Sequence, residues 1–177
     1  MFQLFSCIVS KESSRIMEVK DVTNVLFVKN NKVLLGLKKR GFGKSKYNGF
    51  GGKLKRGETI VEAAKREARE EVGLIMREYY KAAVIDFKDS YPLRMHLYVC
   101  TAWVGKVVES DGMAPTWFSF DNIPYGEMWD DDKYWFEKAL NGKRFKASFS
   151  FENNDDVDGT AENRVVSYSL KLVENFE

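Results

Sequence analysis

The chain has 177 residues, a formal net charge of +2 and 44% hydrophobic residues. This balance is typical of one globular domain with a sizeable core, and it predicts neither a nucleic-acid polymer nor an anionic membrane as a partner. No segment approaches the roughly 20 apolar residues of a membrane-spanning helix. Cys7 and Cys100 are too few for a disulfide framework, so we expect a reducing compartment. The cytoplasm is predicted, with the mitochondrial or nuclear compartment as alternatives, and the protein is expected to be a monomer.

Residues 1–20 are predicted to be a disordered extension, and residues 21–177 a single folded domain. The extension begins with a short apolar run and continues with Lys, Ser and Arg, as in organelle-targeting sequences. Glu12 and Glu18 argue against targeting, because transit peptides are poor in acidic residues. Met17 offers a second start site ahead of the folded domain.

Two short apolar runs at residues 21–28 and 32–37 predict a pair of hairpin strands, because Asn30 and Asn31 between them are typical of a turn. Residues 38–52, KKRGFGKSKYNGFGG, are rich in glycine and in positive charge. Glycines of this kind let backbone N–H groups approach an anion closely. Such a loop is more often a flexible connection, but its position directly before an acidic segment favours phosphate binding.

Residues 58–72 predict a helix that ends at Gly73, because they are rich in Ala, Glu and Arg. At 3.6 residues per turn, one face of this helix is apolar. It consists of Ile60, Val61, Ala64, Ala68 and Val72. The opposite side, which is expected to face solvent, carries Glu62, Lys65, Arg66 and Arg69.

Three glutamates with i, i+3, i+4 spacing share one edge of this predicted helix, and Glu71 projects furthest toward the apolar face. They are Glu67, Glu70 and Glu71. Carboxylates so close together repel, and a hard cation such as Mg²⁺ or Mn²⁺ would offset the repulsion while bridging them to phosphate oxygens. The alternative is a solvated charged helix with ion pairs one turn apart. With His96 the only histidine, catalysis is expected to depend on carboxylates and metal.

The rest of the chain alternates between strand and helix signals without a regular βαβ repeat. Strands are predicted at residues 80–87, 94–104, 116–120, 143–151 and 164–173, the last two forming a hairpin around NNDDVDGT. A helix is predicted to begin near Asp131 or Asp132, with acidic residues at its positive end. This order predicts an α/β fold with a mixed β-sheet sandwiched between helices.

The segment from Gly52 to Leu74 reads Gly, five residues, Glu, seven residues, then Arg-Glu-apolar-x-Glu-Glu-x-Gly-apolar. It resembles the Nudix box, which marks hydrolases of nucleoside diphosphates linked to another moiety, and so implies the Nudix fold. Residues 34–53, 109–118 and 123–136 are also similar to the animal MutT homologues, the oxidised purine nucleoside triphosphatases. The run M-W-x-D-D-x-x-W-F within the last segment is much more specific than the box.

The resemblance implies a purine pocket and assigns eight substrate-binding residues. The edge of the base would be read by Asn48, Asp131 and Asp132. Its faces would be lined by Phe42, Phe87 and Trp129. Thr23 and Lys38 would lie at the edge of the pocket or near the triphosphate. Two adjacent buried carboxyls suit this task if one is protonated, because one then donates while the other accepts. Taken alone, the two aspartates favour helix capping. Trp135 and Phe136 are interpreted as core residues.

The resemblance also implies a metal site and a catalytic set. The metal, Mg²⁺ or Mn²⁺, would be held by the backbone carbonyl of Gly51 and by Glu67, Glu70 and Glu71. Either Glu70 or Glu71 would be the general base. Arg66 is expected to orient the catalytic glutamates through a salt bridge, while Glu58 ties down the loop.

One position departs from the family pattern. Gly112 stands where the relatives have a glutamate that contributes to the metal site. Glu109 or Asp111 could substitute for it, so the fourth carboxylate stays unassigned.

The resemblance therefore implies a magnesium-dependent nucleoside triphosphate pyrophosphohydrolase. It would convert 8-oxo-dGTP and other oxidised purine nucleoside triphosphates to the monophosphate and pyrophosphate, which sanitises the nucleotide pool and avoids DNA damage. Another Nudix activity, on methylated purine triphosphates, dinucleoside polyphosphates or RNA caps, is the first alternative. A nucleotide-binding module without turnover is the second, and the intact REAREE segment argues against it.

Overall fold

The computed structural model describes residues 18–88, 92–152 and 164–176. Most of the predicted extension and the NNDDVDGT loop lie outside these ranges. The elements within them are β1 (Lys20–Lys29), β2 (Lys32–Lys38), β3 (Tyr47–Asn48), α1 (Ile60–Val72), β4 (Ile75–Phe87), β5 (Leu93–Val104), β6 (Met113–Ser119), the short 3-10 helices η1 (Phe120–Asn122) and η2 (Tyr125–Glu127), α2 (Asp132–Leu140), β7 (Phe145–Phe151) and β8 (Val165–Leu172). No helix among the described residues is long and apolar enough to cross a membrane.

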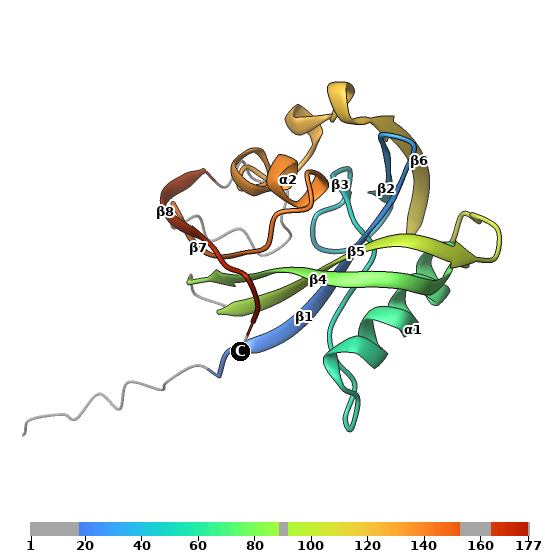
Figure 1. Ribbon diagram of the computed structural model, residues 1–177, viewed down its shortest axis with the longest axis horizontal. Coiled ribbons are helices and arrows are strands. Elements are labelled where there is room, and N and C mark those ends of the chain that lie inside the picture. The colour runs from blue at the N-terminus through green and yellow to red at the C-terminus, as the bar shows by residue number, and fades with distance from the viewer. Residues whose placement is uncertain (1–17, 89–91, 153–163, 177) are drawn as a thin grey trace, which may run out of the picture.

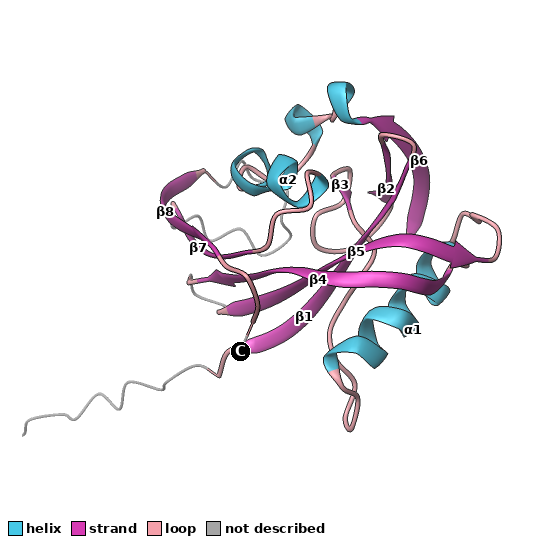
Figure 2. Cartoon of the chain, viewed as in Figure 1, coloured by secondary structure: helices cyan, strands magenta, loops and turns pink. Residues whose placement is uncertain are grey.

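The strands form one mixed sheet, and each face of the sheet carries one helix (Figures 1 and 2). The strand order is β3-β2-β1-β5-β4-β7-β8, and β6 pairs with β2. The pairs β1–β5 and β4–β7 are parallel, whereas the other neighbours are antiparallel. The prediction of a mixed sheet sandwiched between helices is confirmed.

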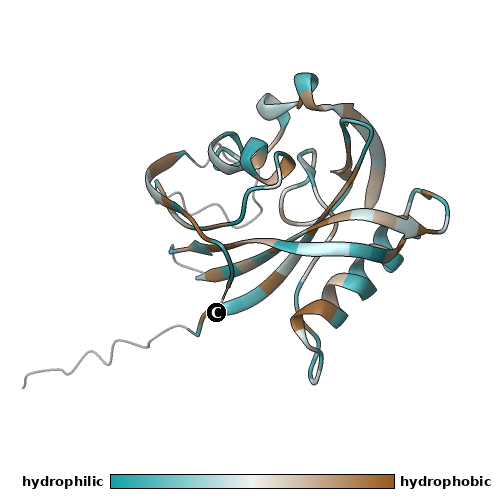
Figure 3. Cartoon of the chain, in the orientation of Figure 1, coloured by the Kyte–Doolittle hydropathy of each residue, from teal (hydrophilic) through white to brown (hydrophobic). Residues whose placement is uncertain are grey.

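Alternate residues of the central strands fill two separate cores. Val25 and Phe27 of β1 pack with Ala64 and Ala68 of α1, on what we call the α1 face. Leu26, between them, joins the cluster around α2, on the α2 face. Successive side chains of a strand point to opposite faces, so a strand buried on both faces has no polar alternation. In Figure 3, where each residue is coloured by its hydropathy, brown apolar stretches occur both on strands of the sheet and on α1.

Helix α1 begins at Ile60, two residues later than the sequence predicts. Thr59 is extended and forms a capping box: its Oγ1 accepts from the Glu62 N–H at 3.3 Å, and a Glu62 carboxylate oxygen accepts from the Thr59 N–H at 2.8 Å. Glu58 lies before the helix, and its carboxylate accepts from the Lys55 N–H at 2.8 Å. The predicted end at Gly73 is confirmed, since this residue is left-handed with φ 75°.

Two strands extend beyond their predicted limits. Strand β4 begins at Ile75 instead of residue 80, because the polar run before Tyr80 pairs with β5 through several register shifts that hide any alternation. Strand β6 begins at Met113 instead of residue 116, and it includes Pro115. A proline fits there because, among the described residues, β6 is an edge strand whose partner is β2, and an edge strand tolerates the loss of one N–H donor.

The capping box allows a test of how α1 is held. Thr59→Ala should lower the stability by about 1 kcal/mol, because it removes the hydroxyl that accepts the Glu62 N–H. For a domain of this size, that loss corresponds to about 2–4 °C in the melting temperature. Thr59→Ser is the matched control, since it keeps the hydroxyl and should melt within about 1 °C of the parent. An unchanged melting temperature for Thr59→Ala would show that the box does not hold the helix.

Candidate active site

The loop before α1 lies directly against β1. The Thr23 N–H donates to the Gly52 carbonyl at 2.9 Å, and the Val25 N–H donates to the Phe50 carbonyl at 2.8 Å. A Cβ at Gly51 would lie 1.9 Å from the Thr23 carbonyl oxygen, so only glycine allows this approach. The loop is therefore fixed in place below the acidic edge of α1.

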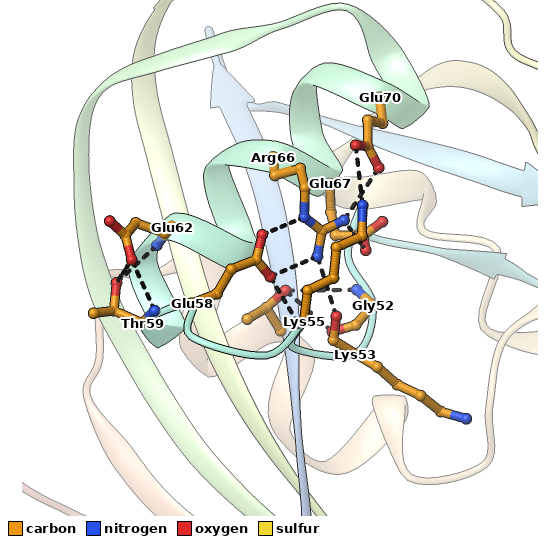
Figure 4. Close-up of polar contacts among 10 residues, drawn as sticks. Gly52, Lys53, Lys55, Glu58, Thr59, Glu62, Arg66, Glu67 and Glu70 are labelled. Carbon is orange, nitrogen blue, oxygen red and sulfur yellow. Dashed lines mark hydrogen bonds and ion pairs between the residues drawn. The ribbon is translucent and has the colours of Figure 1, made fainter.

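Arg66 lies at the centre of an ion-pair network on that edge (Figure 4). Its Nε and Nη2 bind both oxygens of Glu58, at 2.5 and 3.0 Å, while its Nη1 lies 2.6 Å from Glu67 and 3.1 Å from Glu70. These bonds lower the Glu58 pKa to about 2 and raise that of Arg66. The prediction that Arg66 belongs to the solvated side is wrong, since only 17% of its side chain is exposed. The expected salt bridge to the glutamates is present.

Glu71 is held apart from the arginine. One of its carboxylate oxygens accepts from the Gly51 N–H at 2.9 Å. Burial raises the Glu71 pKa to about 7, and the Gly51 hydrogen bond acts in the opposite direction. The charge of Glu67 raises this pKa further, while Lys38 lowers it, which places Lys38 within electrostatic reach of the acidic edge. Glu71 therefore combines a buried position with a high proton affinity.

The three glutamates supply the oxygen donors that a hard divalent cation prefers, but they do not converge on one point. Arg66 holds Glu67 and Glu70, and Gly51 holds Glu71, so no group of three acidic, histidine or cysteine side chains in the described ranges is arranged as a metal site. Within the same ranges, no hydrogen bond reaches the Gly51 carbonyl. That carbonyl and the adjacent carboxylates fit a divalent cation in chemical type.

The candidates for a fourth carboxylate lie on the loop before β6. Glu109 forms an ion pair with Lys39, whose Nζ also donates to the Ser110 carbonyl at 2.8 Å. Asp111 is exposed. A Cβ at Gly112 would meet nothing within 4 Å, so the space for a longer side chain is open. Neither acidic residue joins the network around Arg66.

Two carboxyls are buried side by side at the start of α2. Asp131 is 4% exposed and accepts from the Trp135 Nε1 at 2.8 Å, while Asp132 is 3% exposed and accepts from the Trp129 N–H at 3.0 Å. Asp131 makes no side-chain capping bond, so the capping interpretation is wrong for it. Burial raises the Asp131 pKa to about 6. Burial and then the neighbouring Asp131 charge raise the Asp132 pKa well above its ordinary value.

The predicted aromatic wall divides into two groups. Phe42 stacks on Trp129 with ring centroids 5.1 Å apart, and the Lys46 ammonium lies 5.2 Å from the Trp129 ring. Phe87 instead stacks on Phe149 at 6.2 Å, on the α2 face. Trp135 and Phe136 are each 1% exposed, which confirms them as core residues.

Two further residues that were predicted to bind substrate, Thr23 and Asn48, lie on different faces of the sheet. Thr23 points to the loop below α1, where its Oγ1 lies 3.4 Å from the Gly52 carbonyl oxygen. Asn48 contacts Asn24 instead, whose Nδ2 donates to the Asn48 Oδ1 at 3.0 Å. The sequence interpretation missed Asn24. Its signal was a polar residue inside the apolar run VTNVLFV, where every neighbour on the strand is buried or half-buried.

The two buried aspartates predict an unusual dependence of stability on pH. Both carboxyls have folded pKa values above their ordinary value of 3.8. Their contribution to stability is therefore complete below that value and is lost as the pH rises through the folded pKa values. Asp132→Asn stays neutral, so it should raise the melting temperature at pH 8 by at least about 3 °C, on the order of 1 kcal/mol. At pH 4 the gain should vanish; an equal gain at both pH values would contradict the assignment.

Known proteins resemble this chain over most of its length. The family model of the NUDIX domain matches residues 17–139. The "Oxidized purine nucleoside triphosphate hydrolase" of Mus musculus is 40% identical over 157 residues, covering 87% of this chain and 96% of its own. The protein of the same name from Danio rerio is 45% identical over 141 residues, which cover 78% of this chain and 90% of that protein. A MutT protein from Bacillus halodurans shares the fold, with a TM-score of 0.72 at 24% identity, over 86% of this chain and 97% of that one. The chain belongs to the NUDIX domain family.

Proposed function

We propose that the protein hydrolyses oxidised purine nucleoside triphosphates, 8-oxo-dGTP among them, to the monophosphate and pyrophosphate. The observation that carries the proposal is the pair Asp131 and Asp132, buried side by side at the stacked ring of Trp129. Two adjacent carboxyls with raised pKa values share a proton readily, so one donates and the other accepts. The relatives that are 40% and 45% identical carry the name of this activity.

The base would be recognised on the α2 face. Trp129 and Phe42 supply aromatic surface, and stacking of this kind contributes about 1–3 kcal/mol per base. An 8-oxopurine differs from the ordinary base in carrying a carbonyl at C8 and an N–H at N7. The aspartate pair and Asn48 would read the polar edges of the base. Phe87, which packs with Phe149, would act as a more distant wall.

The triphosphate would lie at the edge of α1, on the other side of β1. There Gly51, Glu67, Glu70 and Glu71 would hold Mg²⁺, or Mn²⁺ in its place, once Glu67 and Glu70 exchange their Arg66 contacts for the cation. The bound ion supplies charge neutralisation and an activated water for in-line attack on phosphorus. Glu71, isolated from Arg66 and buried, is the better placed proton acceptor of the two candidates. Lys38 would lie beside the phosphates, Thr23 would support the glycine loop, and Arg66 would position the glutamates.

Product analysis tests the reaction. With 8-oxo-dGTP and Mg²⁺, equal amounts of 8-oxo-dGMP and pyrophosphate should form, and excess chelator should stop the reaction. Release of a diphosphate and orthophosphate would contradict the proposal. Faster turnover of a methylated purine triphosphate, a dinucleoside polyphosphate or a capped RNA in the same assay would assign the site to another Nudix substrate. Binding without turnover would identify a nucleotide-binding module.

A further inference from the structure

Asn24 is a buried amide in an otherwise apolar part of β1. It is 3% exposed and lies on the α2 face, between Val22 and Leu26 along the strand. Its Nδ2 lies 3.0 Å from the Asn48 Oδ1 and 3.6 Å from the Met95 sulfur. Its own Oδ1 is buried without a hydrogen-bond partner. An unsatisfied polar atom costs stability, so packing alone gives no reason for an amide at this position.

The orientation of both amides follows from one backbone group. The Gly49 N–H, which can only donate, lies 2.9 Å from the Asn48 Oδ1. The oxygen of Asn48 must therefore face Gly49, and the group of Asn24 that approaches the same oxygen must be its NH₂. The Asn24 oxygen then points to Gly49, where an added Cβ would lie 2.0 Å from it. Glycine at position 49 is what leaves room for this arrangement.

Among the described residues, this arrangement leaves the Asn48 NH₂ group, and not its oxygen, free to contact a ligand. Two donors occupy its oxygen, and no described residue accepts from its Nδ2. An asparagine at a binding site can otherwise rotate to offer either a donor or an acceptor. Here rotation would turn the NH₂ group toward two N–H donors, which is unfavourable.

We propose that Asn24 is a positioning residue that fixes the Asn48 side chain as a hydrogen-bond donor toward the purine. The pocket then selects a base whose edge at Asn48 offers an acceptor, such as a carbonyl oxygen or an unprotonated ring nitrogen. This inference rests on the proposed function only in taking Asn48 as a residue that contacts the base. Asn24 itself touches no substrate and acts through Asn48.

The first test needs no substrate. In the ligand-free protein, hydrogen exchange followed by NMR should show slow exchange for the Asn24 side-chain NH₂, which is buried and bonded. The Asn48 NH₂ should exchange fast. The reverse order, a protected Asn48 and an exposed Asn24, would overturn the proposal whatever the enzyme hydrolyses. Failure of this inference is thereby separated from failure of the proposed function, which would show as no turnover by the parent.

The second test is a double-mutant cycle of Asn24→Leu and Asn48→Ala. Alone, Asn24→Leu should raise KM for 8-oxo-dGTP about tenfold with kcat within about twofold, because one fixed hydrogen bond to the base is lost. In the Asn48→Ala background the same change should alter KM less than about twofold. Equal rises of KM in both backgrounds, or a lower melting temperature with normal KM, would reduce Asn24 to a structural role.

Discussion

Glu71→Gln should lower kcat by more than about 10²-fold, the scale expected when a general base is lost. The amide keeps the volume of the side chain but neither accepts a proton nor binds a cation as a carboxylate does. The fold should survive, because burial already disfavours the charged form of Glu71. The measurement is steady-state hydrolysis of 8-oxo-dGTP with saturating Mg²⁺, together with a melting curve.

Glu62→Gln is the matched control for this substitution. It makes the same chemical change on the same helix, at a residue whose oxygens, within the described part of the chain, bond only Thr59 in the capping box. A glutamine can still accept from the Thr59 N–H, so kcat should stay close to that of the parent. Near-normal kcat for Glu71→Gln would remove Glu71 from the mechanism and leave Glu70 as the candidate base.

The second large effect concerns the choice of base. Asp132→Asn should reduce the ratio of kcat/KM for 8-oxo-dGTP over dGTP by at least about tenfold, because sites built to pair specific polar edges discriminate by several kcal/mol. An amide cannot share a proton with Asp131, so the pair loses its combined donor and acceptor. Both substrates should be measured at the same pH, since the parent pair titrates.

Asp130→Asn makes the same change two residues earlier along the chain. Asp130 is ion-paired with Lys133 and accepts from the Val165 N–H at 2.9 Å, and its charge raises the Asp131 pKa less than burial does. Its substitution should leave the substrate preference unchanged. If Asp132→Asn also kept the parent preference, the aspartates would be structural residues of the α2 turn and the base would be read elsewhere.

Local sequence rules were sufficient for the parts of the molecule that depend on local geometry. The 3.6-residue period placed Glu67, Glu70 and Glu71 on one edge of α1, and Gly73 ended the helix as expected. The continuous apolar runs of β1 and β2 predicted strands within a few residues of their limits. Family resemblance, and not periodicity, pointed to the aspartate pair.

Contacts between residues far apart in the sequence explain the predictions that were wrong or incomplete. Arg66 is not on the solvated side of α1, because Glu58, eight residues earlier, binds it. Phe87 does not stack with Trp129, because β7 brings Phe149 beside it. Asn24 acquires its partner from β3, 24 residues away. Pairings of this kind depend on strand order and register, which no single segment specifies.

The comparison of 8-oxo-dGTP with dGTP in the parent enzyme tests the central claim most directly. Initial rates of pyrophosphate release, measured with Mg²⁺ over a range of each nucleotide, give kcat/KM for both. The buried aspartate pair predicts a ratio of at least about 10 in favour of the oxidised base, since one additional well-placed hydrogen bond corresponds to about tenfold. A ratio near one, or a preference for dGTP, would contradict the claim that this site reads oxidation of the purine.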